Sequence, residues 1–335
     1  QGYSSAASDV YKRQPLGLIS IILSIAFYRD AHKSKEKVQF DKMGAFTLIA
    51  GLTCFLIGIQ MLGLASNVMV ALFVIVGIIL LISFIFIEKK AKSPIVPLNV
   101  FLNKALVGDF VLFALAWGAY IAVNTYLPMW SQAILGTSAL IGGMTLIPNS
   151  ILDIAGSQTA PYFLRRFSNY HLLIVDFTLI VITILVLILV PLNTSYWILM
   201  LIAAFSGLGV GSIFVILQIK VQIDASEKDM APATSLSFLI RILAQTIMAA
   251  IYGVIMNLAL ARGIAGHRGI TMTMMNKLSD AESAKSLPTA MLPTMRTIFH
   301  SGIIEIMCVA LFLVVCAYVI NLSLIHISEP TRLRR

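Results

Sequence analysis

The chain contains too few charged residues to cover the surface of a water-soluble fold. Asp, Glu, Lys and Arg make up 12% of its residues and hydrophobic residues 59%, against roughly 25% and 45–50% in soluble proteins. Its three cysteines all lie inside apolar runs without metal-ligand spacing, so neither a disulfide nor a zinc site is expected. The sequence also lacks a histidine cluster, a phosphate loop and a serine–histidine pair. We therefore expect no catalytic residues, no metal, no cofactor and no enzyme activity.

Long apolar runs dominate what is present. A helix needs about 20 apolar residues to cross a bilayer, and eight runs meet this length. An apolar stretch at 15–28 precedes them and is too short, as expected for a truncated transmembrane helix. The pattern predicts an all-α integral membrane protein. The eight runs are 44–63, 67–87, 105–129, 138–160, 172–191, 196–217, 233–259 and 302–322.

Basic residues alternate between the short loops. Because Lys and Arg near a span resist translocation, the basic loops are predicted to be cytoplasmic. The formal net charge of +9 then reflects orientation and contact with anionic lipid, and no nucleic-acid partner is expected. The long stretch 260–301 must be external although it is basic, and the charge rule is weakest for long loops. Basic residues occupy the loops 29–42, 88–104, 165–171 and 218–232 and are absent from 64–66, 130–136 and 192–195.

The two ends of the chain differ from the rest. Residues 1–14 and 323–335 break abruptly from the apolar register and resemble translated sequencing-adapter sequence. We interpret them as a non-native leader and a non-native tail and exclude them from reasoning about the fold. The gene product is then expected to be longer than this chain.

Several motifs are typical of one transporter family. They are Tyr126-Leu127-Pro128, Gln132, Leu135-Gly136, Gly142-Gly143 and Leu146-Ile147-Pro148, with Phe40-Asp41 and Gly44, the glycines 207, 209 and 211, and Arg241 followed by Gln245. Together they resemble the fourteen-helix drug:proton antiporters of the major facilitator superfamily. One departure is the loop 161–167, which resembles a superfamily motif but lacks its glycine and aspartate.

This resemblance implies a domain organisation. It assigns 15–28 as the truncated sixth span, 29–104 as a cytoplasmic loop, an extra central helix pair and a linker, and 105–322 as the C-terminal six-helix bundle. The N-terminal bundle, and with it the fifth-span antiporter signature, is absent. The missing half is therefore an expected partner, and no motif in this chain establishes antiport.

Two ionisable side chains are predicted to lie deep in the bilayer. Asp153 and Arg241 are each about eight residues from a cytoplasmic span end, which places them roughly 12 Å deep. Charged groups at this depth are costly and often functional. They are candidates for coupling transport to a proton or another cation. A static buried ion pair between them is the alternative.

A polar and aromatic face accompanies these charges. Aromatic faces attract cations, so this face suits a lipophilic cation, although such stripes also serve ordinary packing. Asp109 is expected to be solvated near a cytoplasmic span end, and Asp176 to pair with Arg165 or Arg166. The candidate cavity residues are Trp117, Tyr120, Asn124, Asn149 and Gln245.

These features favour one function and leave two alternatives open. The resemblance implies a fragment of a multi-pass carrier in the cell membrane of a bacterium. It would export an amphipathic or cationic small molecule, such as an antibiotic, in exchange for protons by alternating access. The alternatives are a carrier of one specific metabolite and a fragment that is inactive without its N-terminal bundle.

The alternation of basic loops predicts which loops a membrane-impermeant reagent can reach. Cysteines introduced in 88–104 or 218–232 should be protected from such a thiol reagent added outside, and one in 264–286 should react. Labelling from outside at 88–104 would contradict the orientation.

Overall fold

Helices form every regular element in the part of the chain that the structure describes. The computed structural model describes residues 18–19, 21–23, 25–27, 41–61, 66–91, 94–96, 98–267, 269–279 and 281–332. The predicted leader, most of the stretch 15–28 and the loop 29–40 lie outside these residues. The helices are α2 (Lys42–Gln60), α3 (Asn67–Glu88), η1 (Leu98–Leu102), α4 (Lys104–Ala133), α5 (Ala139–Met144), α6 (Ile147–Leu164), α7 (Asn169–Leu189), α8 (Tyr196–Asp224), α9 (Met230–Ala265), α10 (Met272–Leu278), α11 (Ala281–Ala284) and α12 (Leu292–Arg332).

The eight predicted spans are confirmed as helices long and apolar enough to cross a membrane. The all-α fold class is confirmed with them, and the chain is a multi-pass membrane protein. Two boundaries differ from those expected. The fourth span is interrupted, because α5 ends at Met144 and α6 begins at Ile147 with Pro148 in its first turn, a position where a missing N–H is tolerated. The last helix continues past residue 322 to Arg332, so no helix end marks the predicted tail.

Polar caps begin several of these apolar helices. The side chains of Asp41, Ser66 and Asn103 accept hydrogen bonds from backbone N–H groups at the starts of α2, α3 and α4. Such caps satisfy donors that have no partner within the helix. At the other end of α4, Gly136 adopts φ 72°, a left-handed conformation that a side chain would strain. The chain thereby turns from α4 into α5.

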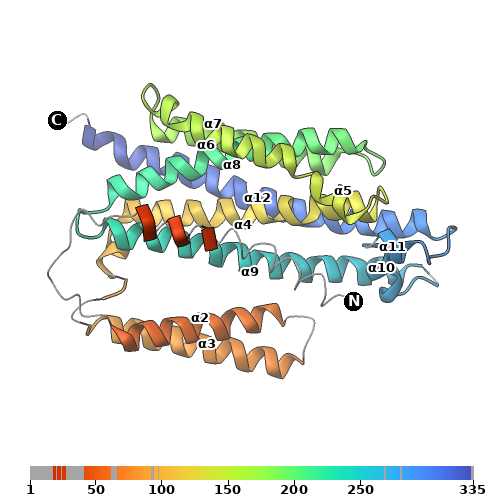
Figure 1. Cartoon of the computed structure of the whole chain (residues 1–335), viewed down its shortest axis with the longest axis horizontal. Coiled ribbons are helices and arrows are strands. Elements are labelled where there is room, and N and C mark those ends of the chain that lie inside the picture. The colour runs from red at the N-terminus through yellow and green to blue at the C-terminus, as the bar shows by residue number, and fades with distance from the viewer. Residues whose placement is uncertain are drawn as a thin grey trace. The chain divides into compact units, whose positions relative to one another are not determined.

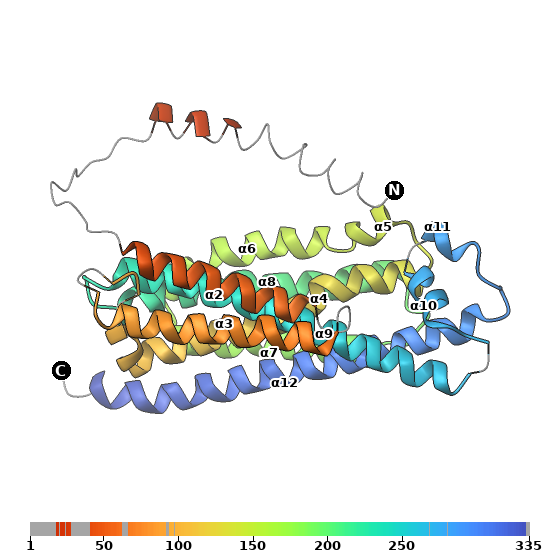
Figure 2. The same cartoon turned by 90° about the horizontal axis from the view of Figure 1, so that it is seen from below.

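The connections alternate between two ends, as the loop pattern requires. Figures 1 and 2 show the α6–α7 and α8–α9 connections at the end where α4 begins, with α10 and α11 at the opposite end. Helices α4 and α8 are the most enclosed, with 61% of their most apolar window buried, compared with 6% for α9. Helices α4 and α8 therefore form the centre of the described bundle, and most residues of α9 are half-buried or exposed.

The closest helix–helix contact joins α6 to α8. A Cβ atom added at Gly207 would collide with the carbonyl oxygen of Asn149, and one added at Gly211 with that of Asp153. From the other side, a Cβ at Gly156 would collide with the carbonyl oxygen of Leu208. Small residues allow such close backbone approach between membrane helices. These three glycines therefore set the separation of α6 and α8.

A glycine exchange tests this close packing. Gly156→Ala should lower the thermal stability of the detergent-solubilised chain, because the new methyl group meets backbone atoms that cannot move independently. Gly253→Ala on α9 is the matched control, since a Cβ there has no neighbour within 4 Å. It should be neutral or stabilising by up to about 1 kcal/mol through helix propensity. Equal effects of the two exchanges on the melting temperature would refute the steric argument.

Candidate functional site

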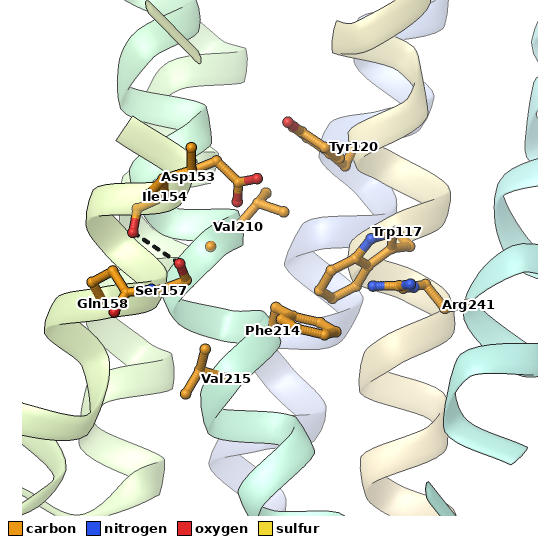
Figure 3. A pocket seen from close by; sticks show the side chains of 11 residues that line it. Trp117, Tyr120, Asp153, Ile154, Ser157, Gln158, Val210, Phe214, Val215 and Arg241 are labelled. Carbon is orange, nitrogen blue, oxygen red and sulfur yellow. Dashed lines mark hydrogen bonds between the residues drawn. The ribbon is translucent and has the colours of Figure 1, made fainter. Parts of the chain in front are cut away.

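A cavity of about 470 Å³ opens among side chains of α4, α6, α8 and α9. Figure 3 shows Asp153 on α6 pointing across it toward α4, and Arg241 entering from the opposite side beside Trp117 and Phe214. The cavity thus joins acidic, basic and aromatic groups from four separate helices. Its lining consists of Trp117, Tyr120, Asp153, Ile154, Ser157, Gln158, Val210, Gly211, Phe214, Val215 and Arg241.

Three aromatic rings surround the guanidinium of Arg241. Its central carbon lies 5.5 Å from the ring centre of Trp117 and 4.9 Å from those of Phe214 and Phe238. Such contacts stabilise a cation by about 0.5–2 kcal/mol each, with the larger value where water is excluded. No ion pair joins Arg241 to Asp153 among the described residues. The charge of Arg241 is thus held by ring faces, and it faces the carboxylate of Asp153 across the cavity without direct contact (Figure 3).

A buried amide fixes the tyrosine of the lining. The hydroxyl of Tyr120 donates to Oδ1 of Asn149 at 2.6 Å. The amide nitrogen of Asn149 donates to the carbonyl oxygen of Ala203 and to Oγ of Ser206, both at 2.8 Å. Asn149 is 1% exposed and lies outside the lining. Asn149 therefore does not face the cavity; its hydrogen bonds link α6 to α8 and orient Tyr120 of α4.

The structure brings together four of the seven candidate residues from the sequence. Asp153, Arg241, Trp117 and Tyr120 line the cavity, and Asn149 supports it. The two remaining candidates, Asn124 and Gln245, are half-buried and lie outside the lining.

Sequence reasoning missed several lining residues. Ser157 lies one helical turn beyond Asp153 and was visible from its spacing. Phe214 lies one turn beyond Gly211 and also contacts Arg241. Nothing in the sequence indicated the role of Phe214, because phenylalanine is common in apolar membrane spans.

The other intramembrane carboxylates have partners that the sequence did not indicate. Asp176 accepts a hydrogen bond from Oγ of Ser212 at 2.6 Å, so the predicted pairing with Arg165 or Arg166 is wrong. Asp109 is 0% exposed and lies 3.3 Å from Nζ of Lys220, so the expectation of a solvated group is also wrong. In both cases a side chain on α8 provides the contact, and which helix packs beside which could not be read from spacing.

The described residues contain no group of three or more His, Cys, Asp or Glu side chains placed to hold a metal ion. The charged groups of the cavity are one carboxylate and one guanidinium. Their chemistry suits binding of a charged or amphipathic molecule.

No family model matches the chain. It is 25% identical to Multidrug resistance protein 3 of Bacillus subtilis over 277 residues, covering 82% of this chain and 51% of that protein. It is 28% identical to the Multidrug transporter protein MdtP of the same organism over 252 residues, covering 74% and 46%. It is also 29% identical to the uncharacterized MFS-type transporter EfpA of Mycobacterium tuberculosis, covering 46% and 29%.

The chain spans about half the length of the two Bacillus relatives. Among solved structures, a bacterial homologue of the human lysosomal transporter Spinster, in an inward-facing and occupied conformation, shares 13% identity. That match has a TM-score of 0.49 and covers 84% of this chain and 64% of the other. Two of these three curated relatives are named as transporters and the third as a multidrug resistance protein, in agreement with the expectation that the chain is not an enzyme.

The separation of Asp153 from Arg241 predicts that their contributions to stability are independent. Arg241→Met should lower the unfolding free energy through the lost ring contacts, and Asp153→Asn should change it little. A double-mutant cycle measured by thermal unfolding should be additive within about 0.5 kcal/mol. Rescue of Arg241→Met by Asp153→Asn would instead indicate a direct pair, because removing one member of such a pair strands the other.

Proposed function

We propose that the chain, which is related to the multidrug and efflux transporters of the major facilitator superfamily, is part of a secondary active transporter. It would export amphipathic or cationic compounds in exchange for protons by alternating access. The observation that carries this proposal is the cavity, in which the carboxylate of Asp153 faces aromatic side chains at bilayer depth and forms no ion pair with a residue that the structure describes. The names of the curated relatives support the class of substrate.

The lining favours a flat or amphipathic cation over a small polar metabolite. Trp117, Phe214 and Tyr120 offer aromatic surface, and Val210 and Val215 offer aliphatic surface. A sugar or similar metabolite would need more hydroxyl and amide groups than the few found here, because each of its polar atoms must be paired when water is removed. An amphipathic cation needs only apolar surface and one carboxylate.

Asp153 is the residue that we assign to coupling. A carboxylate in the cavity can hold a proton or lie beside a cationic drug, and each occupant disfavours the other. Binding of a proton from one side of the membrane would therefore release the drug there. For an uncharged amphipathic compound, a proton moving down a potential of 100 mV supplies about 2.3 kcal/mol apart from its concentration gradient, whereas for a monovalent cation exchanged one for one only that concentration gradient contributes.

The partial burial of α9 supports the proposal that a second bundle completes the cavity. Arg241 and Gln245 lie on this helix and are only half-buried. A charged side chain left facing lipid would cost at least about 2.5 kcal/mol. We propose that the other half of the transporter covers this face, with the whole protein in the cell membrane of a bacterium.

The proposal predicts the phenotype of one isosteric exchange in the full-length transporter that contains this chain. Asp153→Asn should abolish pH-driven efflux of cationic dyes from energised vesicles, because an amide cannot exchange a proton with a cation. The abundance of the protein in the membrane should be unchanged, because none of the described residues forms an ion pair with Asp153.

Glu305→Gln is the matched control. Glu305 pairs with Arg262 at the surface, where both groups are exposed, and its exchange should leave efflux intact. Undiminished dye efflux in Asp153→Asn would refute the coupling role of Asp153.

A further inference from the structure

A second cluster of ionisable groups lies away from the cavity, between α4, α7 and α8. Nζ of Lys220 is 3.3 Å from Oδ1 of Asp109 and 3.5 Å from Oδ2 of Asp224. It also lies 3.3 Å from the hydroxyl of Tyr170 and 4.4 Å from the centre of that ring. Asp109 and Trp117 are eight residues apart on α4, which separates this cluster from the cavity by about 12 Å along the helix.

The burial of this cluster is unequal. Asp109 is 0% exposed and Lys220 is 4% exposed, whereas Asp224, near the end of α8, is 25% exposed. Neither carboxylate oxygen of Asp109 accepts a hydrogen bond from a described residue. Its described ionisable neighbours are Lys220 and Asp224, and those of Lys220 are Asp109, Asp224 and Tyr170. Water can therefore solvate Asp224 from its exposed side, but it does not reach Asp109.

The cluster contains two carboxylates and one ammonium group. Lys220 lies between the two carboxylates, 3.3 Å from Asp109 and 3.5 Å from Asp224, so its single positive charge can compensate only one of them. If both were ionised, the cluster would carry one net negative charge, and Asp109, which is 0% exposed, would share its only cation with Asp224. Removing a charge from water without compensation is the most costly form of burial. One proton added to the cluster makes it neutral.

We propose that Asp109, Lys220 and Asp224 form a proton-binding site distinct from the drug cavity, in which Asp109 carries the proton. On release, the O–H bond of Asp109 breaks and the proton passes to water at the exposed side of Asp224. The electron pair stays on Asp109, which then competes with Asp224 for Lys220. The site itself is independent of the proposed function, and only its use in transport rests on that function.

Helix α8 connects this site to the cavity. Phe214 and Val215 line the cavity and lie five or six residues before Lys220 on the same helix. Neighbouring elements are tied to the site as well, since Asn103 donates to the carbonyl oxygen of Asp224 and Asn321 of α12 donates to that of Tyr170. A change in which carboxylate holds Lys220 therefore acts on the helix that carries the drug-facing side chains.

Infrared spectroscopy of the whole chain in lipid nanodiscs tests the proposal directly. A protonated carboxylic acid has a C=O stretch distinct from that of a carboxylate, and labelling aspartate with carbon-13 restricts the shifted signal to Asp residues. The unmodified chain should show an Asp109-dependent band at neutral pH and lose it when the pH is raised. Asp109→Asn should remove the component of the band that comes from Asp109 and leave any component from Asp153 or Asp176, so the signal is read from the difference between the two spectra. Glu305→Gln should leave the band unchanged, because that carboxyl group lies at the surface and is not an aspartate.

A second variant tests the proposal independently, in case Asp109→Asn does not fold. Lys220→Met removes the ammonium group that stabilises ionised Asp109, so the band should persist to more alkaline pH than in the unmodified chain. A static ion pair predicts the opposite pattern, with no aspartic-acid band depending on Asp109 at neutral pH, and that result would overturn the proposal. The measurement requires neither transport nor a second bundle. An Asp109 band together with absent dye efflux would therefore refute the proposed function and leave the proton site standing.

Discussion

The close approach of α6 and α8 is the constraint on which the cavity depends. Gly156, Gly207 and Gly211 bring the two backbones together, and Asn149 fastens them by hydrogen bonds to Ala203 and Ser206. Asp153 lies one turn beyond Asn149, directly against Gly211. The carboxylate is therefore fixed by the contact itself. A side chain at any of these glycines would move Asp153 relative to Phe214 and change the width of the cavity.

Helix α4 carries polar groups at two depths for different purposes. Trp117 and Tyr120 face the cavity, where the hydroxyl of Tyr120 is held by Asn149. Asp109, two turns away, faces Lys220, and neither residue belongs to the cavity lining. Helix α8 contacts α4 at both depths: it contributes Phe214 to the cavity and Lys220 to the buried cluster. The two central helices thus share an aromatic contact between Trp117 and Phe214 at one depth and an ion pair between Asp109 and Lys220 at the other.

The sequence predicted the fold well because apolar run length decides membrane crossing. All eight spans were found, and Asp153, Arg241, Trp117 and Tyr120 do meet in one cavity. The failures have a common physical cause. Lys220 was assigned to a cytoplasmic loop because hydropathy falls after residue 217, yet α8 continues to Asp224 and buries this lysine against Asp109. Helix continuation past an apolar run, and the choice of neighbouring helix, depend on packing that a one-dimensional pattern does not contain.

The way in which Arg241 is held has a consequence for the electrical work of transport. Its charge rests on three ring faces, so it stays in place whether or not Asp153 is neutralised. If Asp153 exchanges one proton for one monovalent cation, the total charge of the cavity is the same in both loaded states. The electrical work of moving the cavity with a proton bound is then cancelled by the work of moving it back with the cation bound. For such cargo this site would respond to the pH gradient rather than to the voltage.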